Sequence, residues 1–134
     1  MKRSKRKTIL LIAAICLLAG IIALAIYLKS VAEYKQAVRT TSFDEISISD
    51  VSDGVYIGDY DVNFIYAKVE VAVQNGKITN IDILEHKNAR GQPAESVADK
   101  MIAEQKIDVD AVSGATNSSI VIKKAVEHAL EKGI

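Results

Sequence analysis

The sequence is poor in cysteine, with Cys16 as the single example among 134 residues. Because Cys16 lies inside a long apolar run, the folded part of the chain has no thiol for a disulfide, a zinc cluster or cysteine catalysis. A lipoprotein cleavage signal would require a small residue just before the cysteine, and Ile15 stands there instead. These absences exclude the disulfide-rich and thiol-dependent classes and argue against lipidation.

An excess of positive charge is also lacking in the part that can fold. The chain has 17 basic and 17 acidic residues, but five of the basic ones precede residue 8. Residues 29–134 therefore carry 12 basic against 17 acidic side chains, a net charge of −5. Such an acidic domain is a poor candidate for binding nucleic acid, and we expect no nucleic-acid partner.

A long apolar run is present near the N-terminus. The twenty-one residues from Thr8 to Leu28 carry no charge, and at about 1.5 Å per residue a helix of this length crosses a bilayer core. Ala23-Leu24-Ala25 offers an alternative, a signal-peptide cleavage site after Ala25, but the run exceeds the usual signal core of roughly 7–15 residues. We expect an uncleaved, single-pass anchor in the cytoplasmic membrane. The basic N-terminus would stay in the cytoplasm and the C-terminal domain would be extracytoplasmic.

The rest of the chain divides by composition. We expect a cytoplasmic tail at 1–7, a membrane helix at 8–28, a juxtamembrane stalk and linker at 29–52 and one folded domain at 53–134. Period-two patterns predict strands from Val55 to near Gly58, over 63–74 and over 77–85. Asn75-Gly76 is typical of a type I′ hairpin. In the third strand, alternation places Ile81 and Ile83 on one face and Ile78 on the other.

Two amphipathic helices are expected after the strands. Pro93 suits a first helical turn, and an apolar stripe at helical spacing follows it. A second helix is predicted from about Ser118 to Lys132, ended by Gly133. Strands followed by helices predict an α+β domain, with a small antiparallel sheet and helices packed on one face.

The segment 110–119 before the last helix combines a glycine, an alanine and several hydroxyl and amide side chains. Helix amino ends present unpaired N–H groups and a positive partial charge, which suit a phosphate. Gly114 lets the backbone approach a bulky ligand, and Thr116 has a stiff side chain that would hold its hydroxyl in a defined direction. Serine and threonine before a helix are also ordinary caps. The full combination, however, should arise by chance on the order of once in several thousand chains.

The pattern Asp110-x-x-Ser113-Gly114-Ala115-Thr116 resembles the flavinylation motif of the FMN-binding domain family. That family includes the C subunit of the sodium-translocating NADH:quinone oxidoreductase and the G subunit of the ferredoxin:NAD oxidoreductase complex. The resemblance covers residues 53–132. Further segments resemble family blocks in the same order: Asp53-Gly54-Val55-Tyr56-Ile57-Gly58, Asn75-Gly76-Lys77-Ile78, Glu85-His86-Lys87 and Val109-Asp110.

The resemblance implies that Thr116 receives FMN through its phosphate from FAD. A separate magnesium-dependent flavin transferase would do this outside the cytoplasm and release AMP, with Asp110 as part of what the transferase recognises. Other residues implied to lie at the cofactor are Ser113, Gly114, Ala115, Asn117, Ser118, Ser119 and His86. No catalytic acid–base pair and no metal site of the chain's own is expected.

Two functions remain open from the sequence. In one, the chain is an electron-transfer flavoprotein that accepts electrons from a membrane donor, such as a quinone-linked protein or a subunit of the complexes named above, and passes them to an extracellular acceptor. In the other, it is a module that binds FMN non-covalently, or an assembly module of a membrane complex with no redox role of its own. An intact Thr116 favours the first.

Overall fold

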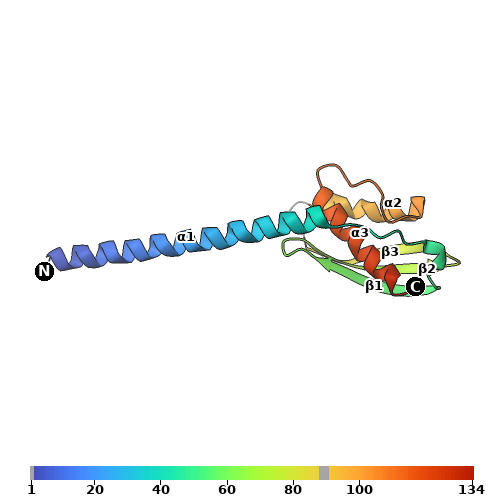
Figure 1. The fold of residues 1–134 in the computed structure, drawn as a ribbon, viewed down its shortest axis with the longest axis horizontal. Helices are drawn as coiled ribbons and strands as arrows, with labels where there is room; N and C mark the ends of the chain where they lie inside the picture. Colours follow the sequence, from blue (N-terminus) through green and yellow to red (C-terminus); the bar gives the residue numbers. More distant parts are fainter. Residues whose placement is uncertain (1, 88–90) are drawn as a thin grey trace. The chain divides into compact units, whose positions relative to one another are not determined.

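A computed structural model of the chain describes residues 2–87 and 91–134. The chain divides into two compact units, one up to Lys35 and one from Gln36 to Ile134, and each is described by itself. The elements, drawn in Figure 1, are α1 Lys2–Thr40, η1 Ile48–Asp50, β1 Gly54–Asp61, β2 Tyr66–Gln74, β3 Lys77–Lys87, η2 Gln92–Ser96, α2 Val97–Glu104 and α3 Thr116–Glu131.

The first unit lies within α1, which is long and apolar enough to cross a membrane. The side chains of its apolar run are exposed in the isolated chain, as for Leu10 at 69% and Ile22 at 51%. These leucines and isoleucines, from Ile9 to Leu28, are not buried by any described part of the chain, and a bilayer would supply an apolar environment for them. The expected membrane helix and the helical stalk after it are parts of this one helix.

The second unit is built on an antiparallel sheet with strand order β1-β2-β3. Asn75 and Gly76 join β2 to β3 and both have positive φ, 54° and 71°, which confirms the type I′ turn. The Asp53 carboxylate accepts a hydrogen bond from the Asn75 amide at 2.8 Å and fixes this turn against the start of β1. β1 and β3 extend beyond the predicted limits, to Asp61 and Lys87, whereas β2 begins at Tyr66, three residues later than predicted, because Asn63 has a positive φ of 78° that interrupts the extended backbone.

One sequence prediction about the faces of the sheet is wrong. Ile78 is buried together with Ile81, on the face that carries the buried valines of β2. The reason is an irregularity in register between Ala72 and Val73, which places Ile78 opposite Val73 while Ile81 stays opposite Val71. A bulge inserts one residue, so every side chain beyond it changes face relative to strict alternation.

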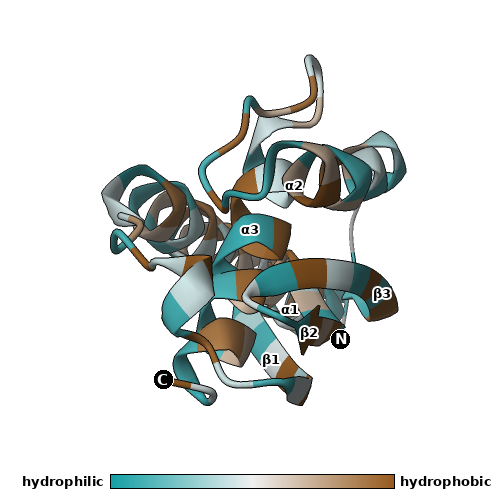
Figure 2. Ribbon diagram, turned by 90° about the vertical axis from the view of Figure 1, so that its right-hand side faces the viewer, coloured by the Kyte–Doolittle hydropathy of each residue, from teal (hydrophilic) through white to brown (hydrophobic). Residues whose placement is uncertain are grey.

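Both α2 and α3 cover this buried face, which confirms the α+β class with helices on one side (Figures 1 and 2). The contact between α3 and β1 is unusually close. A Cβ added to Gly58 would lie 2.2 Å from the Ala125 carbonyl oxygen and 2.4 Å from the Ala129 nitrogen. Glycine on the strand and alanines on the helix therefore bring the two backbones together.

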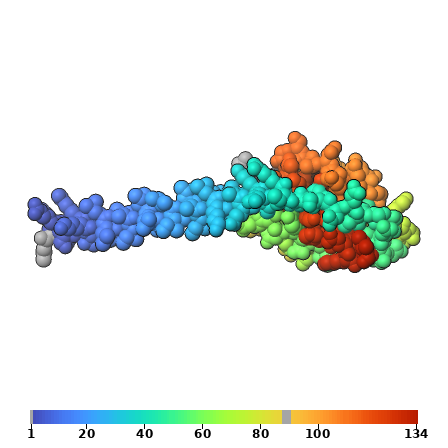
Figure 3. Space-filling model, viewed as in Figure 1, coloured from blue at the N-terminus to red at the C-terminus, as the bar shows by residue number. Residues whose placement is uncertain are grey.

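The segment 36–52 belongs to the second unit. Its apolar side chains Val38, Ile48 and Val51 are buried, and in Figure 3 the segment lies across the surface of α3. Thr41 contributes a hydrogen bond between its hydroxyl and that of Tyr60, at 3.0 Å. The structure thus packs much of the expected stalk and linker onto the domain.

Side chains from the helical layer reach the two outer strands. The ammonium of Lys132 donates to the Ile57 carbonyl, and His128 Nδ1 lies 2.8 Å from the Asp59 carbonyl oxygen. On β3, the side-chain amide of Gln105 bonds both backbone groups of Ile78, each at 2.8 Å. Backbone groups at these positions of β1 and β3 are therefore satisfied by α3 and by the end of α2.

Candidate functional site

The motif forms a tight turn just before α3. The Ala115 amide donates to the Val112 carbonyl at 3.0 Å, which closes a four-residue turn. Gly114 is its third residue and has a φ of +80°, the value that a type II turn requires there and that favours glycine. A Cβ at Gly114 would meet nothing within 4 Å, so the outer side of this turn is open.

Ser119, from the first turns of α3, holds this loop from inside. Its buried hydroxyl accepts a hydrogen bond from the Val112 amide at 3.0 Å and donates to the Ala115 carbonyl at 2.8 Å. The Ser119 amide also donates to Ala115, so this amide belongs to the helix ladder. The contact of Ser119 with a phosphate stays a prediction, whereas its part in shaping the loop is visible.

Helix α3 begins at Thr116, two residues earlier than the pattern predicted. Thr116 and Asn117 are exposed and Ser118 is buried. The first helical hydrogen bond is the one from Ser119 to Ala115, so the amides of residues 116–118 precede it. The cap residue Ala115 provides no side-chain acceptor, and the first turn contains no acidic residue. This helix start thus has the dipole that suits a phosphate, beside an exposed threonine.

The other predicted residues of the motif lie on the surface of the same loop. Asp110 and Ser113 are exposed, and Ala115 is buried beneath the turn. A protein approaching from outside therefore meets Asp110, Ser113, Gly114 and Thr116 on one short stretch of chain. These four residues are therefore accessible to an approaching molecule.

His86 lies near the end of β3, paired with Ala67 on the covered face of the sheet. Its side chain is 4% exposed, and Nδ1 is 3.9 Å from a carboxylate oxygen of Glu95. Burial lowers the pKa of His86 below its ordinary value of 6.5, and the Glu95 carboxylate opposes this effect. In Figure 1 the end of β3 and the start of α3 lie at the same end of the unit.

Sequence reasoning missed Lys123. Its side chain is buried on α3, and its ammonium is bonded to Asp108 and to the Val109 carbonyl, immediately before the motif. A lysine in an amphipathic helix normally indicates a solvated face, so composition gave no signal. Its spacing of four residues from Ser119 is the one feature that could have suggested a shared role.

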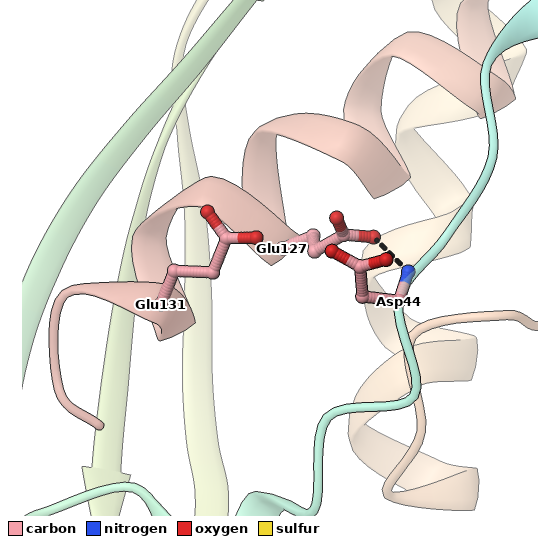
Figure 4. A group of neighbouring side chains, drawn as sticks. All are labelled: Asp44, Glu127 and Glu131. Atoms are coloured by element: carbon pink, nitrogen blue, oxygen red, sulfur yellow. Dashed lines mark hydrogen bonds between the residues drawn. The ribbon is translucent and has the colours of Figure 1, made fainter.

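Three carboxylates gather farther along α3, from Asp44, Glu127 and Glu131 (Figure 4). Glu127 is fully buried, and one of its oxygens accepts a hydrogen bond from Lys124 at 2.6 Å. The other oxygen accepts from the Asp44 amide at 3.2 Å. Protein donors therefore compensate the buried charge, which accounts for the carboxylate at this position.

The sequence model of the FMN-binding domain family matches residues 65–131, from the start of the β2–β3 hairpin to the end of α3. The chain belongs to the FMN-binding domain family. No curated protein and no solved structure matches the chain. The family match includes His86 and the whole loop with Thr116. An FMN-binding domain together with one apolar N-terminal helix fits a membrane-anchored FMN-binding protein.

Proposed function

We propose that this chain is a membrane-anchored, extracytoplasmic flavoprotein that carries FMN covalently on Thr116 and acts in electron transfer. The observation that supports the proposal most is the exposed Thr116 hydroxyl at the start of α3, directly after an open glycine turn in an FMN-binding domain. The five basic residues before the apolar run support a cytoplasmic N-terminus.

The attachment is a transfer to a hydroxyl nucleophile. The Thr116 oxygen forms a bond to the flavin-side phosphorus of FAD, the pyrophosphate bond breaks, AMP leaves and the hydroxyl proton passes to solvent or to a base of the transferase. A magnesium-dependent flavin transferase supplies the catalytic groups. This chain supplies the threonine, the small neighbours Gly114 and Ala115 that keep the hydroxyl accessible, and helix-start amides that suit the product phosphate.

When bound, the flavin supplies the ability to take up and release electrons, and the protein positions and tunes it. The polar side chains nearest to Thr116 along the chain are Asn117, Ser118 and, three residues away on either side, Ser113 and Ser119. A covalent bond keeps the cofactor from being lost by dilution outside the cytoplasm. The donor would be a membrane protein, quinone-linked or a subunit of the oxidoreductase complexes of this family, and the acceptor an extracellular one.

The test is coexpression of the full chain with a flavin transferase, followed by denaturing gel electrophoresis, in-gel fluorescence and intact mass. We expect wild type to gain the mass of one FMN phosphoester and to fluoresce, and Thr116→Ala to lose both signals. Thr40→Ala, which changes an exposed threonine at the end of α1, is the matched control and should stay modified. A wild-type chain that binds FMN only until it is denatured would instead support the non-covalent module.

A further inference from the structure

The Lys123 side chain is 6% exposed, and its charge is paired on several sides. Its ammonium donates to a carboxylate oxygen of Asp108 at 3.0 Å and to the Val109 carbonyl at 2.8 Å. The ring centroid of Phe43 lies 4.7 Å away, within the range of a cation–π contact. Removing an ammonium from water is unfavourable unless such partners replace its hydration, so the contacts define where Asp108 and Val109 lie.

These contacts fall immediately before Asp110, the first residue of the motif. Ser119, one helical turn before Lys123, binds the Val112 amide and the Ala115 carbonyl. Two buried side chains of one helix therefore anchor the loop, Lys123 at residues 108–109 and Ser119 at residues 112–115. The exposed motif residues lie between and just beyond these anchors.

We propose that Lys123 is a positioning residue for flavinylation, which holds the start of the 108–115 loop so that Asp110 and Thr116 are presented together to the transferase. This inference rests on the proposed function. Lys123 acts through the loop and not on the transferase, because its own side chain is buried. A loop fixed at one end only would sample positions in which the two residues are not presented at the same time, and misplacement of reacting groups slows a reaction steeply.

The chain offers a matched control in the neighbouring Lys124. Its ammonium bonds the Ser42 carbonyl at 2.8 Å and the buried Glu127, and neither partner belongs to the motif loop. Lys124→Met leaves a buried carboxylate without its lysine, so it should destabilise the fold and leave the loop anchored. A second variant, Asp108→Ala, removes one partner of Lys123 at a side chain that is 74% exposed, so it should fold normally.

The experiment uses the full chain in detergent and measures two quantities in wild type, Lys123→Met, Lys124→Met and Asp108→Ala. The first is backbone hydrogen exchange over residues 107–115 before any flavin is added. The second is the initial rate of FMN incorporation with purified transferase, FAD and Mg²⁺. For Lys123→Met we expect exchange to be faster by roughly tenfold to a hundredfold and incorporation to be slower by about tenfold or more. Asp108→Ala should show smaller changes in both. Lys124→Met should match wild type in both despite its lower global stability, because the amides of an exposed loop exchange by local opening and not by global unfolding.

The outcomes separate the two proposals. If wild type takes up no FMN, the proposed function fails, while the exchange data still report on the loop. If wild type is modified and Lys123→Met is modified as fast, the positioning role is overturned, whatever the exchange shows. The positioning role is also overturned if Lys123→Met is modified more slowly while its loop exchanges hydrogen as in wild type. It is overturned as well if Lys124→Met is modified as slowly as Lys123→Met, because the slowing would then follow from lower global stability. If Lys123→Met does not fold, Asp108→Ala decides by the same criteria.

Discussion

Replacing Gly58 by alanine should disturb the contact between β1 and α3. The added Cβ would lie 2.2 Å from the Ala125 carbonyl oxygen and 2.4 Å from the Ala129 nitrogen, where real Cβ atoms essentially never come within 3.0 Å. Both neighbours are backbone atoms, so no side chain can rotate away. The helix must therefore move outward by about 1 Å or the strand must bend.

The magnitude follows from two opposing effects. Overpacking of this kind typically costs about 1–3 kcal/mol, and displacement of α3 also weakens the contacts of the buried Ala125, Val126 and Ala129. Alanine restricts the unfolded chain more than glycine does, and this lower entropy of the unfolded state stabilises the folded protein by at most about 1 kcal/mol. We expect Gly58→Ala to lower the free energy of unfolding by about 2–4 kcal/mol. For a unit of this size the corresponding fall in Tm is roughly 10–25 °C.

The assay is thermal unfolding of the full chain in detergent, followed by near-ultraviolet circular dichroism. Three of the five tyrosines, Tyr56, Tyr60 and Tyr66, lie in the sheet and report on its packing. Val55→Ala changes a 61% exposed residue on the same strand, so it should shift the free energy by no more than about 0.5 kcal/mol. A Gly58→Ala protein as stable as Val55→Ala would refute the close approach of the two backbones.

Two further changes test other parts of the domain. Gln105→Leu removes the bonds to both backbone groups of Ile78, and a urea titration should show a fall of about 1–3 kcal/mol in the free energy of unfolding. Lys106→Leu, at the exposed neighbour, should stay near wild type, and equal midpoints for the two variants would contradict the role of Gln105. Burial keeps the folded-state pKa of His86 below 6.5, so the fold favours the neutral imidazole. The contribution of His86 to the free energy of unfolding should therefore be fully present above about pH 6.5 and should be lost as the pH drops through the folded-state pKa. Glu95→Gln removes the opposing carboxylate and should deepen this loss in urea titrations between about pH 5 and 8, whereas an unchanged pH profile would show that Glu95 does not act on His86.

Much of the architecture could be predicted because it depends on local patterns. The apolar run, the alternation in β2 and the Asn75-Gly76 turn each specify one structure over a few residues. The face on which Ile78 lies could not be predicted, because the bulge depends on the pairing register between β3 and β2. The alternation of apolar and polar residues in β3 does not indicate where such a bulge occurs. The packing of segment 36–52 was also hidden, since its polar composition is typical of a linker and only the folded domain provides its partners.

The candidate site divides in the same way. Thr116 and its neighbours are recognisable because a specific combination of residue types defines them. The part that Ser119 and Lys123 play in holding the loop from inside could not be predicted, because both are residue types that normally face solvent. Their burial follows from the close packing of α3 and from partners fifteen or fewer residues away along the chain, at 108–115.

The side chains that reach the outer strands have a consequence for crowding. Copies held by α1 in one membrane would diffuse in two dimensions, so unpaired strand edges would meet each other at high local concentration. Lys132, His128 and Gln105 occupy backbone groups that a strand from a neighbouring copy would need for lateral pairing. These contacts therefore hinder edge-to-edge pairing between neighbouring domains at these positions.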